Sequence, residues 1–170
     1  MKRRLIVMRH GKSAWDTDAP DDHSRPLSGR GQREAPLVAE RLLELDWRPE
    51  RVVSSDSTRT RQTYTCLSRI FGDPLPVEFT RELYLPDVDA VRGAIARLPP
   101  EASVVLLLGH NPGFEEALSW LTGADERLKT SSAALLETDA DAWGAAAARP
   151  RAFRVVSLIR AKELRPAGPE

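Results

Sequence analysis

Four residues of the sequence have side chains that can meet around an anion: Arg9, His10, Arg59 and His110. Guanidinium groups carry a permanent charge and donate several hydrogen bonds, and an imidazole can donate a hydrogen bond or act as a nucleophile. No carboxylate is evident among the four. If the chain brings them into one small volume, they fit an anion with several oxygens, and a phosphoryl group is the best fit.

Each of these signals is weak when it is taken alone. A lone Arg-His-Gly tripeptide occurs by chance, and a histidine after a strand is more often structural or solvated. A zinc site formed by His10, His23 and His110 is an alternative, but the arginines beside His10 and His110 would repel a cation. The combination therefore favours an anion site without a metal.

Two predicted strands deliver the histidines to one edge of a sheet. The apolar runs from Leu5 to Met8 and from Ser103 to Leu108 are typical of buried central strands. His10 and His110 come just after these runs, each beside a glycine that lets the backbone approach a ligand. Ligands gather at the carboxyl ends of central strands in open α/β sheets, so we expect the two rings to lie close together.

A third predicted strand, from Arg51 to Ser54, brings in the second arginine. Ser57 can cap a helix that runs to about Phe71, and Arg59 lies in the first turn of that helix. Arg61 is two residues further on and should point away from the pocket, because an α-helix has 3.6 residues per turn.

The rest of the chain continues the alternation of helices and strands. The other predicted helices begin at Ser28 and cover 87–98 and 115–121, and the other predicted strands cover 77–79, 133–136 and 153–159. Pro36 lies within the helix predicted to begin at Ser28, so we expect either a kink in that helix or a helix start later than Ser28. The pattern indicates one α/β domain over 1–164, a three-layer sandwich with a mostly parallel sheet and helices on both faces. We expect 139–152 to be a surface connection and 165–170 a disordered tail.

Length and composition bound the function. The chain has 170 residues, which suits one domain, and 25 basic against 25 acidic residues give a formal charge of zero. A chain with no net charge lacks the excess of basic residues that is typical of nucleic-acid-binding proteins. No apolar run is long enough for a membrane span or for the apolar core of a signal peptide. We therefore expect a cytoplasmic protein. The single cysteine, Cys66, excludes an internal disulfide and is expected to be a packed thiol.

Several segments together resemble the histidine phosphatase superfamily, which includes the cofactor-dependent phosphoglycerate mutases. The resemblance is carried, in order, by Leu5-Ile6-Val7-Met8-Arg9-His10-Gly11-Lys12-Ser13, Arg25-Pro26-Leu27-Ser28 with Gly31, the segment from Ser54 to Thr63, and Gly109-His110-Asn111-Pro112-Gly113. It covers roughly 3–160, and the short chain is similar to the small SixA-type phosphohistidine phosphatases. The resemblance implies a phosphoglycerate mutase-like fold, with His10 as phosphoryl acceptor and with Arg9, Arg59 and His110 holding the phosphate.

The chemistry of the residues agrees with these roles. To attack phosphorus, His10 must be neutral, with one ring nitrogen bare and the other N–H held by an acceptor such as a backbone carbonyl. Nearby arginines lower the pKa of an imidazole from about 6.5, which favours the neutral form. Arg9, Arg59 and a protonated His110 would offset charge on the phosphoryl oxygens, so neither a metal nor another cofactor is required.

Further residues are assigned to the site with weaker support. The resemblance makes Glu82 the candidate proton donor, and the alternative is a solvated surface carboxylate. Ser13, Gly11 and Asn111 flank the two histidines and are candidate substrate ligands, whereas Lys12 is expected to be solvated. Arg25 either touches the rim of the pocket or pairs with an aspartate of its loop.

The acidic residues after His10 are expected to form only a hydrated loop. They are Asp16, Asp18, Asp21 and Asp22. This interpretation assigns none of these four aspartates to the phosphate pocket.

The first functional hypothesis is removal of phosphate from phosphohistidine on a partner protein, because no insertion is large enough to form a lid over the pocket. The alternatives are a phosphatase for a small phosphoester and a phosphate-binding module without catalysis. Mutase activity is disfavoured by the short chain, and a Rossmann dinucleotide site is excluded because no G-x-G-x-x-G follows the first strand. The oligomeric state is left open, and a monomer is consistent with the sequence.

Overall fold

A computed structural model describes residues 2–72 and 74–166 of the chain. The strands are β1 (Arg3–Arg9), β2 (Arg51–Ser55), β3 (Val77–Thr80), β4 (Val104–Gly109), β5 (Ser132–Thr138) and β6 (Arg154–Arg160). The helices are α1 (Gly29–Glu44), α2 (Thr58–Phe71), α3 (Val88–Ala96), α4 (Gly113–Thr122), α5 (Trp143–Ala148) and α6 (Ala161–Leu164), with a 3₁₀ turn η1 (Arg81–Leu83).

The strands form one sheet in the order β3-β2-β4-β1-β5-β6. The four strands from β3 to β1 are parallel, whereas β5 runs antiparallel to both of its neighbours. The two predicted central strands, β1 and β4, are paired in the middle of the sheet, with Arg9 opposite Gly109. The predicted α/β sandwich with a mostly parallel sheet is confirmed.

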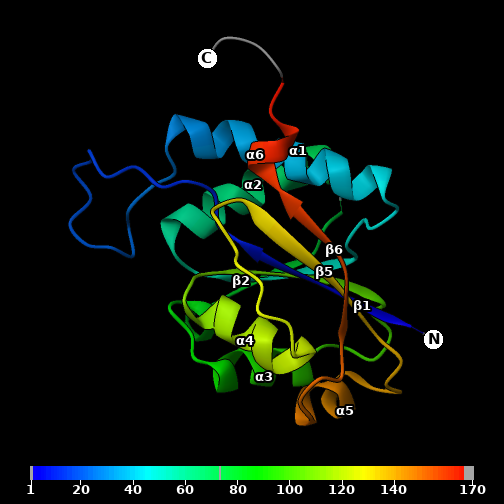
Figure 1. Ribbon diagram of the computed structural model, residues 1–170. Coiled ribbons are helices and arrows are strands. Elements are labelled where there is room, and N and C mark those ends of the chain that lie inside the picture. Colours follow the sequence, from blue (N-terminus) through cyan, green and yellow to red (C-terminus); the bar gives the residue numbers. More distant parts are fainter. Residues whose placement is uncertain (1, 73, 167–170) are drawn as a thin grey trace.

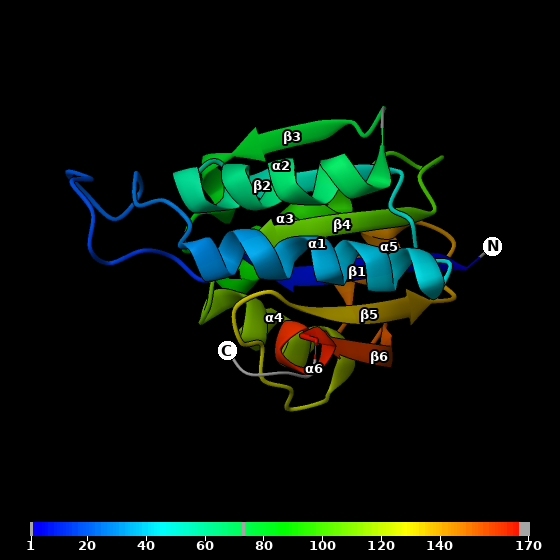
Figure 2. The same ribbon diagram turned by 90° about the horizontal axis from the view of Figure 1, so that it is seen from above.

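Helices cover both faces of the sheet. Helices α1, α2 and α6 lie on one face and α3, α4 and α5 on the other (Figure 1), and the strands run side by side between them in the view from above (Figure 2). Leu5 and Val7 of β1 belong to the core under α3 and α4, while Ile6 and Met8 belong to the core under α1 and α2. Because both faces of β1 are buried, its sequence is a continuous apolar run.

Polar caps start three of the helices. Ser28, Ser57 and Asp87 each accept a hydrogen bond from a backbone N–H in the first turn of α1, α2 and α3. Helix α1 begins directly after Ser28 and contains Pro36 in its interior, so the later start was a wrong alternative.

The segment predicted as a surface connection contains α5, which corrects that expectation. Trp143 is only 2% exposed and its indole N–H donates to the carbonyl of Ala102 at 3.0 Å. Ala146 and Ala147 are buried in the same core. Alanine has the highest helix propensity, and its small side chain allows close packing. The alanine run was interpreted only as a segment of low complexity, so the helix was missed.

The predicted tail falls mainly on 167–170, which lie outside the described residues. Within the described part of the chain, no helix is long and apolar enough to cross a membrane.

Candidate active site

The two predicted site histidines lie next to each other at the carboxyl ends of β1 and β4. The backbone N–H of His10 donates to the carbonyl of Gly109 at 3.1 Å, which continues the strand pairing by one residue. The ring centroids of His10 and His110 are 5.0 Å apart. Both side chains are almost fully buried, with residue exposures of 6% and 1%. Strand register alone therefore creates the centre of the site.

His10 has the tautomer required of a nucleophile. Its Nδ1 lies 2.6 Å from the carbonyl oxygen of Gly11, so Nδ1–H donates and Nε2 keeps its lone pair. Burial, together with the charges of Arg59, Arg9 and Arg25, lowers the pKa of His10 to about 3, against the opposing effect of the hydrogen bond to the Gly11 carbonyl. The ring is therefore neutral at neutral pH, and burial rather than the arginines is the main cause.

Arg59 joins the two histidines. Its Nε donates toward His10 Nε2 at 3.4 Å and its Nη2 lies 3.3 Å from His110 Nδ1. The side chain is 3% exposed, in the first turn of α2 as expected. Arg61 points away, is exposed, and donates to the backbone carbonyl of Asp56. The guanidinium favours an anion beside His10 Nε2.

His110 is held in the opposite tautomer. Its Nε2 lies 2.8 Å from the hydroxyl of Ser55, and Nδ1 faces the Arg59 guanidinium, which can only donate. Burial, together with the proximity of a second titratable ring, His10, and the charges of Arg59 and Arg9, lowers the pKa of His110 to about 2, against the opposing effect of Asp22. His110 is therefore neutral at neutral pH, because its burial and the charges of Arg59 and Arg9 oppose protonation. Donation from a protonated His110 to a phosphoryl oxygen stays a prediction.

Arg9 and Asn111 approach the pocket from the other side and share one acceptor. Arg9 Nη1 and Asn111 Nδ2 both donate to the carbonyl of Leu128, at 3.2 and 2.7 Å. The buried Nε–H of Arg9 has no hydrogen-bond partner in 2–72 and 74–166. An unpaired buried donor beside His10 suits an incoming oxyanion.

Gly11 supports the nucleophile rather than offering a free donor. Its N–H is taken by the hydroxyl of Thr63 at 3.1 Å, and a Cβ on Gly11 would lie 3.2 Å from Gly31 and Leu27. At the other strand end, a Cβ on Gly109 would lie 2.5 Å from the ring of Phe114. Close packing therefore accounts for both glycines, and the role of Gly11 as a substrate ligand stays a prediction.

Arg25 and Ser13 form the rim. Arg25 Nη1 donates to the Ser13 hydroxyl at 2.7 Å and Nη2 pairs with Asp22 at 3.1 Å, so both alternatives weighed for Arg25 are present together. The guanidinium also stacks 3.6 Å from the ring centroid of Trp15.

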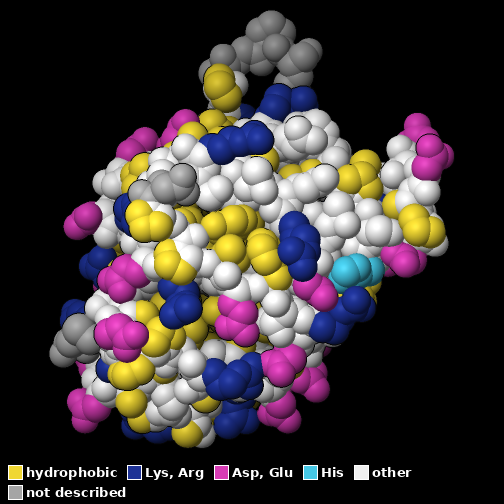
Figure 3. Space-filling model, turned by 180° about the vertical axis from the view of Figure 1, so that it is seen from behind, with side chains coloured by type: hydrophobic (Ala, Val, Ile, Leu, Met, Phe, Trp, Pro, Cys, Tyr) yellow, Lys and Arg dark blue, Asp and Glu magenta, His cyan; other side chains and the backbone are white. Residues whose placement is uncertain are grey.

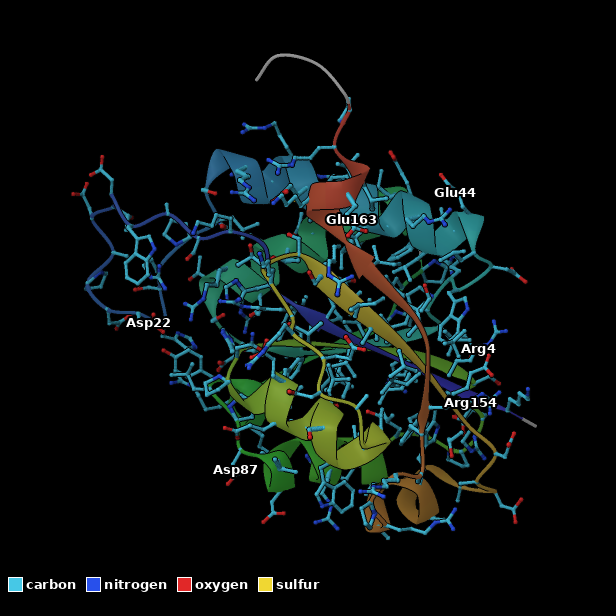
Figure 4. All side chains as sticks on the ribbon, viewed as in Figure 1. Arg4, Asp22, Glu44, Asp87, Arg154 and Glu163 are labelled. Carbon is cyan, nitrogen blue, oxygen red and sulfur yellow. The ribbon has the colours of Figure 1, made fainter. Side chains whose placement is uncertain are left out.

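Asp22 is the site residue that the sequence interpretation missed. Its carboxylate accepts from Arg59 Nη2 at 3.0 Å and from the hydroxyl of Tyr84, and its backbone carbonyl accepts from Arg59 Nη1 at 2.7 Å. Figure 4 shows Asp22 on the loop at the carboxyl edge of the sheet, far from Arg4 and Arg154 at the opposite edge. The expected absence of a carboxylate among the cations is thus corrected.

The electrostatics of Asp22 follow from these contacts. Partial burial acts to raise the pKa of Asp22, but the hydrogen bonds from Tyr84, Arg59 and Arg25 outweigh it and hold the pKa far below its usual range. Tyr84 was also missed, although its ring packs edge-on against His110 at 5.3 Å. The sequence shows only that Tyr84 lies two residues after Glu82 and that several aspartates follow His10. Neither feature indicates that Tyr84 and Asp22 contact each other in the fold.

Glu82 lies in η1, is exposed, and pairs with Arg97, the residue directly after α3. Within the described residues it makes no hydrogen bond to either site histidine. His23 pairs with Asp56 at 2.7 Å rather than facing the other two histidines. No cluster of three or more metal-binding side chains occurs in the described part of the chain.

Comparison with known proteins assigns the family. The sequence profile of the histidine phosphatase superfamily (branch 1) matches residues 5–101. The chain belongs to this superfamily. An uncharacterized chloroplastic protein of Arabidopsis thaliana is 38% identical over 154 residues, which cover 84% of this chain and 70% of that protein. His110 lies beyond the segment matched by the profile, and its place beside His10 comes from the paired strands.

Solved structures give the same assignment for the whole chain. A structure of the protein histidine phosphatase SixA with tungstate has a TM-score of 0.82 at 25% identity and covers 95% of this chain and 99% of its own. A SixA structure from Agrobacterium tumefaciens has a TM-score of 0.78 at 27% identity and covers 93% and 97% of the two chains. A mycobacterial glucosyl-3-phosphoglycerate phosphatase, 19% identical with a TM-score of 0.68 over 92% of this chain and 98% of its own, shares the fold. The protein is thus a phosphatase of this superfamily, and its structure is similar to those of the SixA proteins.

Proposed function

We propose that the protein removes phosphate from phosphohistidine on a partner protein, through a phosphorylated His10. The observation that carries this proposal is the bare Nε2 of His10, which faces the Arg59 guanidinium while its Nδ1–H is held by Gly11. The higher structural similarity to SixA proteins than to the small-molecule phosphatase supports this substrate.

In the first step, the lone pair of His10 Nε2 attacks phosphorus and the bond to the substrate's imidazole breaks. Arg59 and Arg9 donate to the phosphoryl oxygens, and Arg59 exchanges its contact with Asp22 for the phosphate. The negative charge of the phosphoryl group raises the proton affinity of His110, which can then donate to a third oxygen. Positioning and electrostatic stabilisation account for most of the catalysis.

In the second step, water attacks the phosphorylated His10 and the P–Nε2 bond breaks. Because Nδ1–H stays on the Gly11 carbonyl, the intermediate is an imidazolium, and the ring leaves as a neutral imidazole. Both protons of the water remain with the phosphate, which departs as H₂PO₄⁻. In the first step the substrate's histidine leaves in the same way, as a neutral imidazole, when its other ring nitrogen carries a proton. Neither step then needs a carboxylic acid at the position of Glu82.

The proposed reaction uses no metal and no other cofactor, and we place it in the cytoplasm. The fixed charges of Arg9 and Arg59 take the electrostatic role that a divalent cation has in other phosphatases. Activity should then be unchanged by EDTA, and a requirement for added Mg²⁺ or Zn²⁺ would contradict this part of the proposal.

A turnover panel tests the substrate. We would compare a phosphohistidine protein, free phosphohistidine and several sugar phosphates at equal enzyme concentration, using kcat/KM as the measure. The proposal expects the phosphohistidine protein to be preferred by a wide margin. Preference for a sugar phosphate would overturn it in favour of a small-molecule phosphatase, and phosphate binding without any turnover would indicate a binding module.

A further inference from the structure

A basic groove of about 850 Å³ opens beside the active site. It lies between the first turns of α1, the loop that leads into β5, and α6, which packs on the same face of the sheet as α1 (Figure 2). Seven basic and two acidic side chains line it. The whole chain carries equal numbers of basic and acidic residues, so this is a strong local concentration of positive charge.

The acidic side chains of the groove are already paired. Glu34 is 2% exposed, and its two carboxylate oxygens lie 3.1 Å from Arg30 and 3.7 Å from Arg165. Glu163, labelled on α6 in Figure 4, lies 3.9 Å from Arg160. These pairs compensate part of the arginine charge and fix the wall of the groove.

The lysines of the groove form no ion pairs with the described residues. The chain has four lysines, and three of them, Lys12, Lys129 and Lys162, line the groove. All three are exposed, and none has an ion pair within 2–72 and 74–166. The fourth, Lys2, lies at the other end of the sheet and pairs with Glu137. By contrast, basic and acidic side chains are interspersed on the face seen in Figure 3.

Arg9 connects the groove to the phosphate site. It lines the groove and also contributes to the field that lowers the pKa of His10. Lys12 is two residues beyond His10. A macromolecule whose phosphorylated side chain reaches His10 would therefore have its neighbouring residues over the groove.

We infer that the groove formed by α1, α6 and the loop before β5 binds an acidic segment of the phosphorylated partner protein. A lysine ammonium group is a compact, hydrated charge and lacks the planar fork with which an arginine guanidinium binds a phosphate through two hydrogen bonds. Three lysines on three different elements therefore suit carboxylates that are spread along a peptide. Such contacts speed association and select the partner. This inference rests on the proposed function, whose protein substrate it specifies.

The test uses an octaglutamate peptide and the double charge reversal Lys129→Glu with Lys162→Glu. Arg69→Glu with Arg149→Glu is the matched control, because both arginines are exposed, lie outside the groove, and give the same change of net charge. We expect the peptide to bind the unaltered protein with an affinity that falls with salt. The lysine double variant should weaken it at least about tenfold, and the control by less than about twofold.

Kinetics provide the second measurement. The ratio of kcat/KM for the phosphohistidine protein to that for free phosphohistidine should fall about tenfold in the lysine variant and stay constant in the control. Equal effects of both double variants, or no peptide binding, would overturn the inference. Binding of tripolyphosphate without binding of octaglutamate would also overturn it and would indicate a polyphosphorylated small ligand. Absence of any phosphohistidine turnover would refute the proposed function. The peptide-binding measurement would still show whether the groove binds an acidic segment.

Discussion

The strand-end pocket and the loop between β1 and α1 contribute to the same site in different ways. In the pocket, His10 and His110 are placed by paired strands and held by fixed partners, the Gly11 carbonyl and the Ser55 hydroxyl. Asp22 reaches the same cluster from an exposed loop, with its side chain 45% exposed against 3% for Arg59. The difference means that the position of the histidines depends on strand pairing, whereas the position of the Asp22 carboxylate depends on the path of an exposed loop.

The largest effect should come from the centre of the pocket. His10→Ala removes the nucleophile, so both turnover and a covalent phosphoryl label should be lost. The label should be trapped with an alkaline quench after mixing with radiolabelled substrate, because P–N bonds are labile in acid. Label that persists in the variant would place the nucleophile elsewhere.

Arg59→Ala should lower kcat/KM by roughly 10²–10³, the cost of removing one charged donor from an anionic transition state. Vanadate, an oxyanion that can mimic five-coordinate phosphorus, should also bind more weakly. Arg61→Ala is the control, since that side chain is exposed and donates to the Asp56 carbonyl. Equal losses in both variants would mean that the helix, and not the guanidinium in the pocket, carries the effect.

The sequence predicts the pocket because the pocket depends on local patterns. Apolar runs define β1 and β4, and the residues after them must share one edge of a parallel sheet, which places His10 and His110 correctly. Ser57 marks the start of α2 and thereby the position of Arg59. The tautomer of His10 follows from the carbonyl of the next residue.

The sequence could not predict the role of the loop. Whether Asp22 or Asp21 reaches Arg59 depends on the path of an irregular segment, for which no periodicity exists. Likewise, α5 was missed because packing of Trp143 and a few alanines against the core decides it. Glu82 follows a predicted strand, but its side chain pairs with Arg97, the residue directly after α3, and the sequence does not show this contact.

The buried histidines also predict how stability depends on pH. The pKa of His10 is lowered to about 3 and that of His110 to about 2, chiefly by burial, from about 6.5 in the unfolded chain. Below pH ~6.5 the unfolded state therefore binds more protons, and the free energy of unfolding falls as the pH decreases, by up to ~1.4 kcal/mol per pH unit for each histidine. Urea unfolding at pH 7.5, 6.5 and 5.5 measures this slope. His10→Gln should make it shallower, and an unchanged slope would contradict the neutral, buried ring.

A smaller effect is expected from the loop. Asp22→Asn removes the charge that competes with phosphate for Arg59, so vanadate should bind more tightly, by up to about fivefold for a partly exposed ion pair. Asp21→Asn makes the same change of net charge one residue away, where, among the residues that the structure describes, the carboxylate accepts hydrogen bonds only from Ser24, and it should leave the affinity nearly unchanged. Weaker vanadate binding in Asp22→Asn would show instead that the carboxylate is needed to orient Arg59.

The smallest effect should come from Glu82, which lies outside both regions of the comparison. Its carboxylate is exposed and occupied by Arg97, so Glu82→Gln should change hydrolysis of phosphohistidine and of alkyl phosphoesters by less than about twofold. A positioned acid typically contributes ~10²–10⁴-fold when an alkoxide departs, whereas an imidazole with a pKa near ~6.5 leaves without one. A large loss confined to alkyl phosphoesters would therefore show that Glu82 turns from Arg97 toward the pocket and protonates that leaving group. An equal loss with both substrates would instead assign Glu82 to the activation of water in the shared second step. In that case a residue of the exposed turn η1 would take part in catalysis, and the strand-end pocket would not perform the chemistry alone.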